Sequence, residues 1–523
     1  MRPVSPAARA VLVSLLTACA PTGEDKAGDT DDTDAVDTAD TSEDSGDTGA
    51  GDSGDSSAGD SGDSGAGDSG DSGAGDSGAG DSGDSGDSGA GDSGDSGTGD
   101  SGDSGDSGDS GDSGDSGDSG DSGTASILVT GTVTGIDSGA DPLVLVLDDD
   151  EILEVTADGD FVFDTLLPQG VPYAVRVRFQ PSCPAAFCEI QGATGTTGTD
   201  DVSLTVTCRA PVLTLVTSSW GDTLATDLKS LRLTDQLDSH TSGTTVTPRV
   251  VSGSNTSLTG LLGNGVAVDD ARGLLYVGSG GDILVFDGLD TLAGDVAPAR
   301  TLDGATFGLD YLALDPARDV LYATNGSSLQ IHADASTRSG SVTPTATLAG
   351  LGGPQDLALD ARADRLWVVD EDADRVLVFD DASTLTSLTN PDRTILLSKA
   401  GVPDLAWTAI TVDTCNDRLV VGTREVRTDG YRLHTLANAS TLDGGVSLIS
   451  DVRARLDPGQ VMALSYDPLG RLYFLQDSEL SVRRFDAPGD WLGDVSNGST
   501  VKAADWTLRD AIRRGYGIAF WSH

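Results

Sequence analysis

The chain has 523 residues and a formal net charge of −54 at pH 7, from 85 acidic and 31 basic residues. A surface this acidic repels the phosphates of nucleic acids and anionic lipid headgroups, so we expect no nucleic-acid partner. A chain of this length is expected to contain more than one domain.

Residues 1–18 have the pattern of an export signal. Arg2 and Arg9 supply positive charge, and the apolar run that follows, "AVLVSLLTA", is too short to span a bilayer. The run ends in "LTAC", Leu16 to Cys19, which resembles the lipobox of bacterial lipoproteins. This resemblance implies that Cys19 carries the lipid, and that the protein lies at the outer membrane and cell surface of a Gram-negative bacterium. An ordinary secretory signal with an incidental cysteine is the alternative.

Residues 19–124 are almost only Gly, Asp and Ser, with repeats such as "GDSGDSGDSG". With almost no apolar side chains they cannot offset the entropy of ordering, so we expect a disordered linker. Regularly spaced Asp residues repel one another and extend it. A calcium-binding roll would need a large apolar residue in each turn, and the repeats have none. A triple helix would need Pro and unbroken Gly spacing, but the repeats contain no Pro and "SGAGD" breaks the spacing. We interpret it as an acidic stalk.

Residues 125–209 contain short runs of β-forming residues separated by Gly, Asp and Pro, which predict a small β-sandwich. The runs "VTGTVTG", "ADGDFVF", "YAVRV" and "LTVTC" resemble an immunoglobulin-like module of bacterial surface lipoproteins. We expect a disulfide between Cys188 and Cys208, at the ends of the last two predicted strands. For Cys183 and Cys415 we favour two separate thiols, and a bond between the domains is the alternative.

Residues 210–523 contain an internal repeat. Each unit has an apolar strand ending in Asp, a tight turn, a second strand, a loop and a third strand, as in "GVAVDDARGLLYVGSGGDILVFD". Units of four short strands are typical of β-propeller blades. The segment "GYGIAFW" near the C-terminus reads as a first strand, and the runs from residue 212 supply the other strands of the same blade. We therefore predict an all-β chain with six blades closed by a strand from the C-terminus; seven blades are the alternative.

The repeats "YLALDPARDVLYATNGSSLQIHAD" and "DLALDARADRLWVVDEDADRVLVFD" resemble those of NHL/YVTN-like propellers. The resemblance implies a fold and says almost nothing about activity. Aligning the repeats predicts structural roles for several polar residues. The Asp that ends each first strand is expected to satisfy turn amides. His332 and His434, which align with Phe286, Phe379 and Phe485, are expected to pack between blades.

Propeller ligands usually lie on the face formed by the loops between second and third strands and the loops leading into first strands. On this face we place a set of candidate binding residues: Trp220, Asn264, Asp310, Gln355, Asp356, Asp370, Glu371, Asp372, Asp374, Trp407, Arg424, Asp477, Glu479 and Tyr516. The positions two residues before the core of each first strand, including Thr408 and Met462, are expected to form a ring around the channel mouth.

Six-bladed lactonases hold a divalent metal near such a ring with several carboxylates and an Asn. Here the ring offers one Asp, one Asn and one Gln, which departs from that pattern, and we assign no catalytic residue, cofactor or confident metal site. Ca²⁺ at Asp370, Asp372 and Asp374 is an open possibility, because hard cations prefer several oxygen ligands. The leading interpretation is a monomeric, lipid-anchored display of a binding propeller for a protein, glycan or cell-envelope ligand. The alternative is a metal-dependent propeller hydrolase of the lactonase type.

Overall fold

The computed structural model describes residues 126–219, 229–259, 265–303, 311–396, 405–425, 430–446, 450–454, 461–476, 481–491, 501–509, 511 and 515–523. The signal segment, Cys19 and the acidic tract therefore lie outside the described residues. The described part is built from strands and short 3-10 helices, and none of its helices has the length and apolarity of a membrane span.

Residues 126–209 form two four-stranded sheets, ordered β5-β2-β10-β8 and β4-β3-β7-β9, with the short pair β1-β6 beside them. One apolar core, including Val133, Leu145 and Val206, is shared by both sheets, as the predicted sandwich requires. The strands are β1 Ser126–Ile127, β2 Val129–Thr134, β3 Leu143–Leu147, β4 Glu151–Val155, β5 Gly159–Val162, β6 Leu167–Pro168, β7 Pro172–Phe179, β8 Phe187–Gln191, β9 Thr194–Thr196 and β10 Val202–Arg209.

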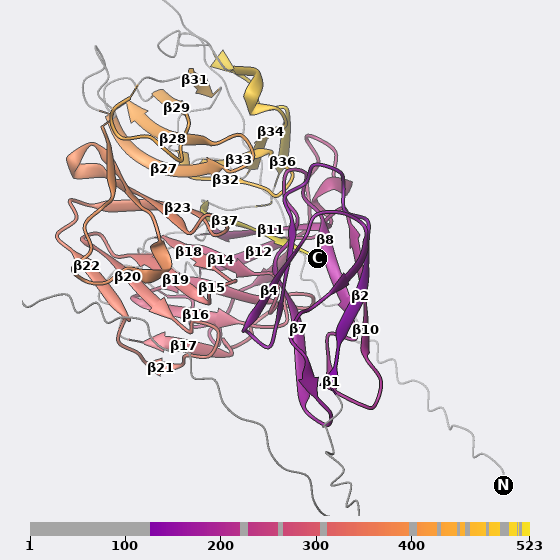
Figure 1. Ribbon diagram of the computed structural model, residues 1–523. Coiled ribbons are helices and arrows are strands. Elements are labelled where there is room, and N and C mark those ends of the chain that lie inside the picture. The colour runs from indigo at the N-terminus through magenta and orange to yellow at the C-terminus, as the bar shows by residue number, and fades with distance from the viewer. Residues whose placement is uncertain are drawn as a thin grey trace, which may run out of the picture. The chain divides into compact units, whose positions relative to one another are not determined.

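The remaining described strands form a series of antiparallel sheets that follow the sequence repeats, the arrangement of a β-propeller (Figure 1). We name each blade after its innermost strand. The blades are β14-β15-β16-β17, β18-β19-β20-β22, β23-β24-β25-β26, β27-β28-β29-β31, β32-β33-β34-β36 and β37-β11-β12-β13.

The strand bounds follow the predicted units. They are β11 Leu213–Ser219, β12 Ser230–Thr234, β13 Arg249–Val251, β14 Val266–Asp269, β15 Leu274–Ser279, β16 Asp282–Phe286, β17 Arg300–Asp303, β18 Leu312–Asp315, β19 Val320–Thr324, β20 Ser328–Ala333, β21 Gly340–Ser341, β22 Ala346–Ala349, β23 Pro354–Asp360, β24 Arg365–Asp370, β25 Arg375–Phe379, β26 Arg393–Leu396, β27 Leu405–Asp413, β28 Arg418–Glu425, β29 Gly430–Ala437, β30 Gly444–Gly445, β31 Ser450–Ala454, β32 Val461–Tyr466, β33 Leu472–Gln476, β34 Ser481–Phe485, β35 Val501–Lys502, β36 Trp506–Arg509 and β37 Gly515–Ser522. The 3-10 helices are η1 Leu237–Ser239, η2 Glu371–Ala373, η3 Ala382–Thr384 and η4 Pro488–Trp491.

Apolar side chains pack between neighbouring blades. Leu275 and Trp521 share one cluster between the β14 and β37 blades, and Tyr322 and Phe379 share another between the β18 and β23 blades. Similar clusters join the other neighbours in turn. The innermost strands contact one another in the order β14, β18, β23, β27, β32, β37 and again β14.

The C-terminal strand β37 pairs antiparallel with β11, with Leu215 opposite Phe520, and the two lie side by side in Figure 1. A second contact holds the end of β37. Asp270, in the turn after β14, accepts hydrogen bonds from the backbone N–H and hydroxyl of Ser522. Burial raises the pKa of Asp270 to about 7. The β14 blade is therefore hydrogen-bonded to the end of β37 through the side chain of Asp270.

The Asp residues that end the first strands have the predicted structural role. Asp315 accepts the backbone N–H groups of Ala317 and Arg318 at 2.9 and 3.0 Å, and its second oxygen accepts Nη1 of Arg318 at 2.7 Å. The same Arg318 nitrogen also donates to the carbonyl of Ala361 in the next blade. Asp269, Asp360, Asp413 and Asp467 likewise accept hydrogen bonds from turn amides.

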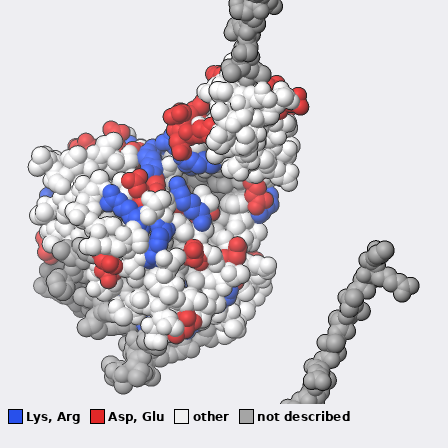
Figure 2. All heavy atoms as spheres, turned by 90° about the horizontal axis from the view of Figure 1, so that it is seen from below, with Lys and Arg blue, Asp and Glu red and all other residues white. Residues whose placement is uncertain are grey.

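Figure 2 shows basic side chains gathered, among acidic ones, on one face of the molecule.

Two of the structural predictions need correction. His332 occupies the expected third-strand position opposite Leu321. His434 lies opposite Val421, whereas the position that matches Phe286 is filled by Leu436, opposite Leu419. The alignment was therefore wrong by two residues, because β28 and β29 are eight residues long where other blades have shorter strands. His434 is still buried, and its Nε2 lies 2.7 Å from the hydroxyl of Thr423.

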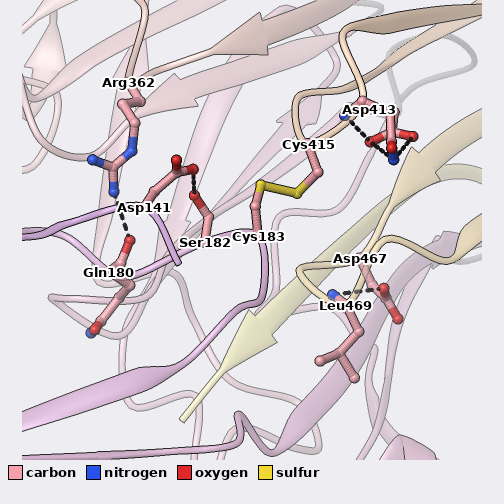
Figure 3. The surroundings of a disulfide bond; sticks show 10 residues. Asp141, Gln180, Ser182, Cys183, Arg362, Asp413, Cys415, Asp467 and Leu469 are labelled. Carbon is pink, nitrogen blue, oxygen red and sulfur yellow. Dashed lines mark hydrogen bonds between the residues drawn. A yellow bond between two sulfur atoms is a disulfide. The ribbon is translucent and has the colours of Figure 1, made fainter. Parts of the chain in front are cut away.

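The second correction concerns the cysteines. The predicted bond between Cys188 and Cys208 is present, on paired strands β8 and β10. Cys183 and Cys415 are also bonded, across 232 residues, so the favoured prediction of two separate thiols was wrong (Figure 3). Cys183 follows β7 in the sandwich, and Cys415 lies in the turn after β27. The reason is spatial: the β7–β8 loop packs against that turn, which neither segment's sequence reveals.

Arg362 strengthens this junction. Its Nη2 donates to the carbonyls of Pro142 and Gln180 at 3.0 and 2.9 Å, and its guanidinium lies 5.2 Å from the ring centre of Phe179. Arg318 lies 5.8 Å from the same ring. The sandwich therefore contacts the turns that follow strands β18, β23 and β27.

Candidate binding face

The innermost strands share an irregularity at the predicted ring. In four blades the ladder between first and second strand contains a β-bulge, and the ring residue is the unpaired one: Gln355 with Asp356, Thr408, Met462 and Tyr516. Bulges interrupt pairing and re-aim side chains, and they are frequent next to functional sites. The other two ring positions, Asn264 and Asp310, lie outside the described residues.

Asp356 is the most distinctive residue of this ring. Its side chain is only 8% exposed, and its two oxygens accept the backbone N–H groups of Leu357, at 2.8 Å, and Ile410, at 2.9 Å. Ile410 belongs to β27, so Asp356 connects two neighbouring innermost strands. Burial raises the pKa of Asp356 to about 7, although the hydrogen bonds from the two backbone amides act to lower it. The carboxyl group is thus poised to change charge near neutral pH.

Helix η2 brings further carboxylates beside this bulge. The backbone N–H groups of Glu371 and Asp372 donate to the carbonyls of Gly353 and Gly352, which fixes η2 against the entry to β23. Burial, together with the charges of Asp372 and Asp374, raises the pKa of Glu371, while a hydrogen bond from Gln355 lowers it. We call Gln355, Asp356, Glu371, Asp372 and Asp374 the acidic rim. Sequence analysis had selected all five.

Asp370 does not belong to the exposed face. It is the last residue of β24, is fully buried, and forms an ion pair with Arg375 at 2.7 Å. Arg424 was also predicted in a loop but lies on strand β28, paired with Ala406. Both strands are longer than the repeat pattern predicts, and this removes these residues from the loop tips.

The remaining predicted residues are only partly located. Trp407 and Tyr516 lie on β27 and β37, whose backbones are described. Trp220, Asp477 and Glu479 lie outside the described residues. Within the described ranges, no group of three or more His, Cys, Asp or Glu side chains is arranged to hold a metal ion. Asp370, Asp372 and Asp374 are thus not brought together as ligands.

A cavity of about 410 Å³ runs along the innermost strands, with lining residues from each of the blades named above. Asp356 lines it near the start of these strands, and Thr411, Ser465 and Tyr466 line it further along. A smaller cavity of about 230 Å³ shares Tyr466 and Pro468 with it and is lined on the other side by sandwich residues between Gln180 and Ala186. The β7–β8 loop thus lies at the end of the cavity where the innermost strands finish, opposite the acidic rim.

Comparison with known proteins adds little. No protein-family model and no curated protein sequence matches the chain. Structural neighbours include a chain of the nidogen/laminin complex (15% identity, TM-score 0.38, covering 59% of this chain and 98% of that one) and a Lactobacillus plantarum protein (15% identity, TM-score 0.38, covering 59% and 99%). Another is the Myceliophteria thermophila Cps50 (Swd1) β-propeller domain (16% identity, TM-score 0.32), where 43% of this chain matches 65% of that one, less than two thirds of its length. The propeller assignment therefore rests on the strand pairings of this chain.

Proposed function

We propose that this protein is a lipid-anchored cell-surface protein that displays a closed, six-bladed β-propeller as a binding module. The module is carried on an extended acidic stalk and an immunoglobulin-like sandwich, and it acts as a monomer. The "LTAC" motif, the Gly/Asp/Ser tract and the position of the tract before the first folded residues support the anchor and stalk. The cyclic order of contacts between innermost strands supports six blades and closure by β37.

One observation carries the binding function: the β-bulges recur at the same ring position in four blades. Each bulge leaves backbone N–H and C=O groups without their partners in the ladder, which costs stability. A bulge repeated at the same position in several blades therefore favours a functional role. The bulged residues lie where the innermost strands begin, beside the acidic rim and the central cavity. A ligand at this face would meet side chains from several blades at once.

The chemistry of the acidic rim indicates the kind of ligand. Asp372 and Asp374 are exposed and Glu371 and Gln355 half-buried, so the rim presents carboxylate acceptors and one amide. Carboxylates bind basic side chains and hydroxyl groups. The proposed ligand is therefore a protein, glycan or cell-envelope component that presents basic groups or hydroxyls.

The test uses the full chain with Cys19→Ser, screened against a glycan array and against solubilised cell-envelope fractions. A Glu371→Gln, Asp372→Asn double variant should lose at least tenfold in affinity for any ligand of the rim. A matched Asp149→Asn variant, which changes an exposed carboxylate of the sandwich, should bind normally. If every ligand found binds the rim variant as tightly as the wild type, the rim is not the binding face.

The anchor and the hydrolase alternative have separate tests. Cys19→Ser should move the full-length protein from the membrane to the soluble fraction and abolish labelling with a radioactive fatty acid. No described contact favours the lactonase-type alternative, but two ring positions, Asn264 and Asp310, are outside the described residues. Hydrolysis of a lactone panel that EDTA abolishes and Ca²⁺ restores would establish the hydrolase and replace the binding proposal.

A further inference from the structure

A third cavity, separate from the proposed binding face, lies between the sandwich and the propeller. Its volume is about 440 Å³, within the range of small-molecule sites. One wall is strand β7 with parts of β8. The other is the turn after β14, including Asp270 and Arg272, together with Pro316 from the turn after β18. Neither domain forms this cavity alone.

Three arginines line the cavity, and two of them are already neutralised. Arg176 pairs with Asp149, and Arg272 pairs with Asp269 at 2.7 Å. The third, Arg178, has no hydrogen bond or ion pair with any described residue, and its buried Nε lacks an acceptor. Its one described partner is the ring of Phe179, with the guanidinium carbon 5.7 Å from the ring centre. A guanidinium has five N–H donors, so Arg178 presents a strong, unused anion-binding group.

The backbone places Arg178 there. In the β3–β7 ladder Val177 pairs with Leu145 and Phe179 pairs with Val144, so Arg178 is the extra residue of a β-bulge. Before the bulge, Val175 and Val177 alternate into the sandwich core. After it, Phe179 packs against arginines of the propeller and no longer belongs to that core. The bulge thus re-aims the end of β7 toward the propeller, as bulges at binding sites often do.

Among the described residues, the neighbouring carboxylate and amide groups offer Arg178 no hydrogen-bond partner. Asp270, the one carboxylate that lines the cavity, accepts both donors of Ser522. The amide group of Gln180 is bonded in both directions to the backbone of Cys188. In a chain with 85 acidic residues, a lining arginine that none of the described carboxylates neutralises is unusual. Its counter-charge is then expected to come from a ligand.

We propose that this cavity binds a small organic anion, with a carboxylate or phosphate head on Arg178 and an apolar body in the cavity. The head follows from the fork geometry of guanidinium, which matches both groups. The body follows from the apolar lining, which includes Val177, Phe187, Ile190 and Ala271. A ligand with many negative charges is disfavoured, because the net charge of −54 repels every charge that Arg178 does not neutralise. This site is independent of the acidic rim and of any ligand there.

The test measures binding to the oxidised full chain by isothermal titration calorimetry with two probes, benzoate and phenyl phosphate, which separate the two head groups. At least one should bind at a single site, and benzyl alcohol, which has the body without the charge, should bind at least tenfold more weakly. Arg178→Gln should weaken the bound probe about tenfold, equal to about 1.4 kcal/mol. Arg209→Gln is the matched control, because Arg209 pairs with Glu189 and does not line the cavity, and it should change the affinity less than threefold.

A melting curve accompanies each variant. If Arg178→Gln proves unstable, Arg178→Lys is the alternative, because it keeps the positive charge but loses the paired N–H donors of the guanidinium. Its affinity for the probe should fall by a smaller factor than that of the glutamine variant. The proposal is overturned if neither probe binds the wild type, if benzyl alcohol binds as well as the anions, or if both Arg178 variants bind with wild-type affinity.

Discussion

The β18 and β23 blades have nearly the same turn after their first strand, "DPARD" at 315–319 and "DARAD" at 360–364. In the first, the arginine stands three residues after Asp315, pairs with it, and reaches the next blade. In the second, Ala363 occupies that position, and Arg362, one residue earlier, binds the sandwich instead. A shift of one position therefore converts an arginine that joins blades into one that joins domains. Repeats keep the fold while single positions within them diverge in function.

The largest effect should come from breaking the covalent part of the junction. A Cys183→Ser, Cys415→Ser double variant opens a closed loop of 232 residues, and we expect the free energy of unfolding to fall by about 5 kcal/mol. Urea unfolding followed by tryptophan fluorescence measures it. The matched variant Cys188→Ser, Cys208→Ser, with a separation of 20, should lose about 3 kcal/mol. A Cys183/Cys415 variant as stable as the wild type would contradict the domain junction.

Asp315→Ala should lower the free energy of unfolding by about 3 kcal/mol, because the carboxylate is fully buried and Arg318 loses the closer of its two carboxylate partners, keeping Asp364 at 3.5 Å. Asp360→Ala removes the corresponding residue of the β23 blade, which accepts one turn amide, from Ala363, among the described contacts, and should lose about 1 kcal/mol. Thermal unfolding of both variants sharpens the comparison. Equal losses would show that the arginine adds nothing to the turn.

Arg362→Ala gives the β23 turn the residue that the β18 turn has at that position, Ala317. The change removes two charged hydrogen bonds to the sandwich and one ring contact, and we expect a loss of about 2 kcal/mol. Hydrogen exchange should accelerate in residues 180–186 while the β18 blade keeps its protection. Arg318→Ala should loosen the contact between the β18 and β23 blades and removes only a ring contact with the sandwich, so it should accelerate exchange in residues 180–186 less than Arg362→Ala does. Unchanged exchange in residues 180–186 would place the strength of the junction elsewhere.

The last effect is a dependence of stability on pH and concerns Asp270, and between pH 5 and 7 it amounts to at most about 3 kcal/mol. Its pKa is raised from 3.8 to about 7, so the folded protein holds this proton more tightly than the unfolded chain does. The stability that it contributes is complete below about pH 3.8 and is lost as pH rises through about 7. Asp270→Asn removes this loss, so its melting temperature should gain on the wild type between pH 5 and 8. A difference that stays constant across this range would contradict the raised pKa.

Much of the propeller followed from the sequence because its repeats carry local signals. The Asp that ends each first strand and the apolar alternation of each unit set the strand order before any contact was known. One repeated signal was missed: "DAST" at 334–337 and 381–384, and "NAST" at 438–441. There Ser336, Ser383 and Ser440 donate to Asp319, Asp364 and Asp417, which fixes the loop after the third strand to the turn before the second.

The candidate sites were less predictable, for a physical reason. The acidic rim was found because it depends on position within a repeat. The bulges were not, because an extra residue in a strand leaves the apolar alternation of its neighbours nearly intact. The contact between Cys183 and Cys415, and the isolation of Arg178, depend on how two domains pack, and no periodicity within either domain encodes this.

Strand β37 also determines when the protein can finish folding. Its partner β11 is made about 300 residues earlier and has seven buried residues. Until β37 has been synthesised, this edge of β11 is unpaired, and unpaired strand edges can pair with strands from other chains. Pairing of β37 with β11 within one chain therefore competes with pairing between chains until β37 is present.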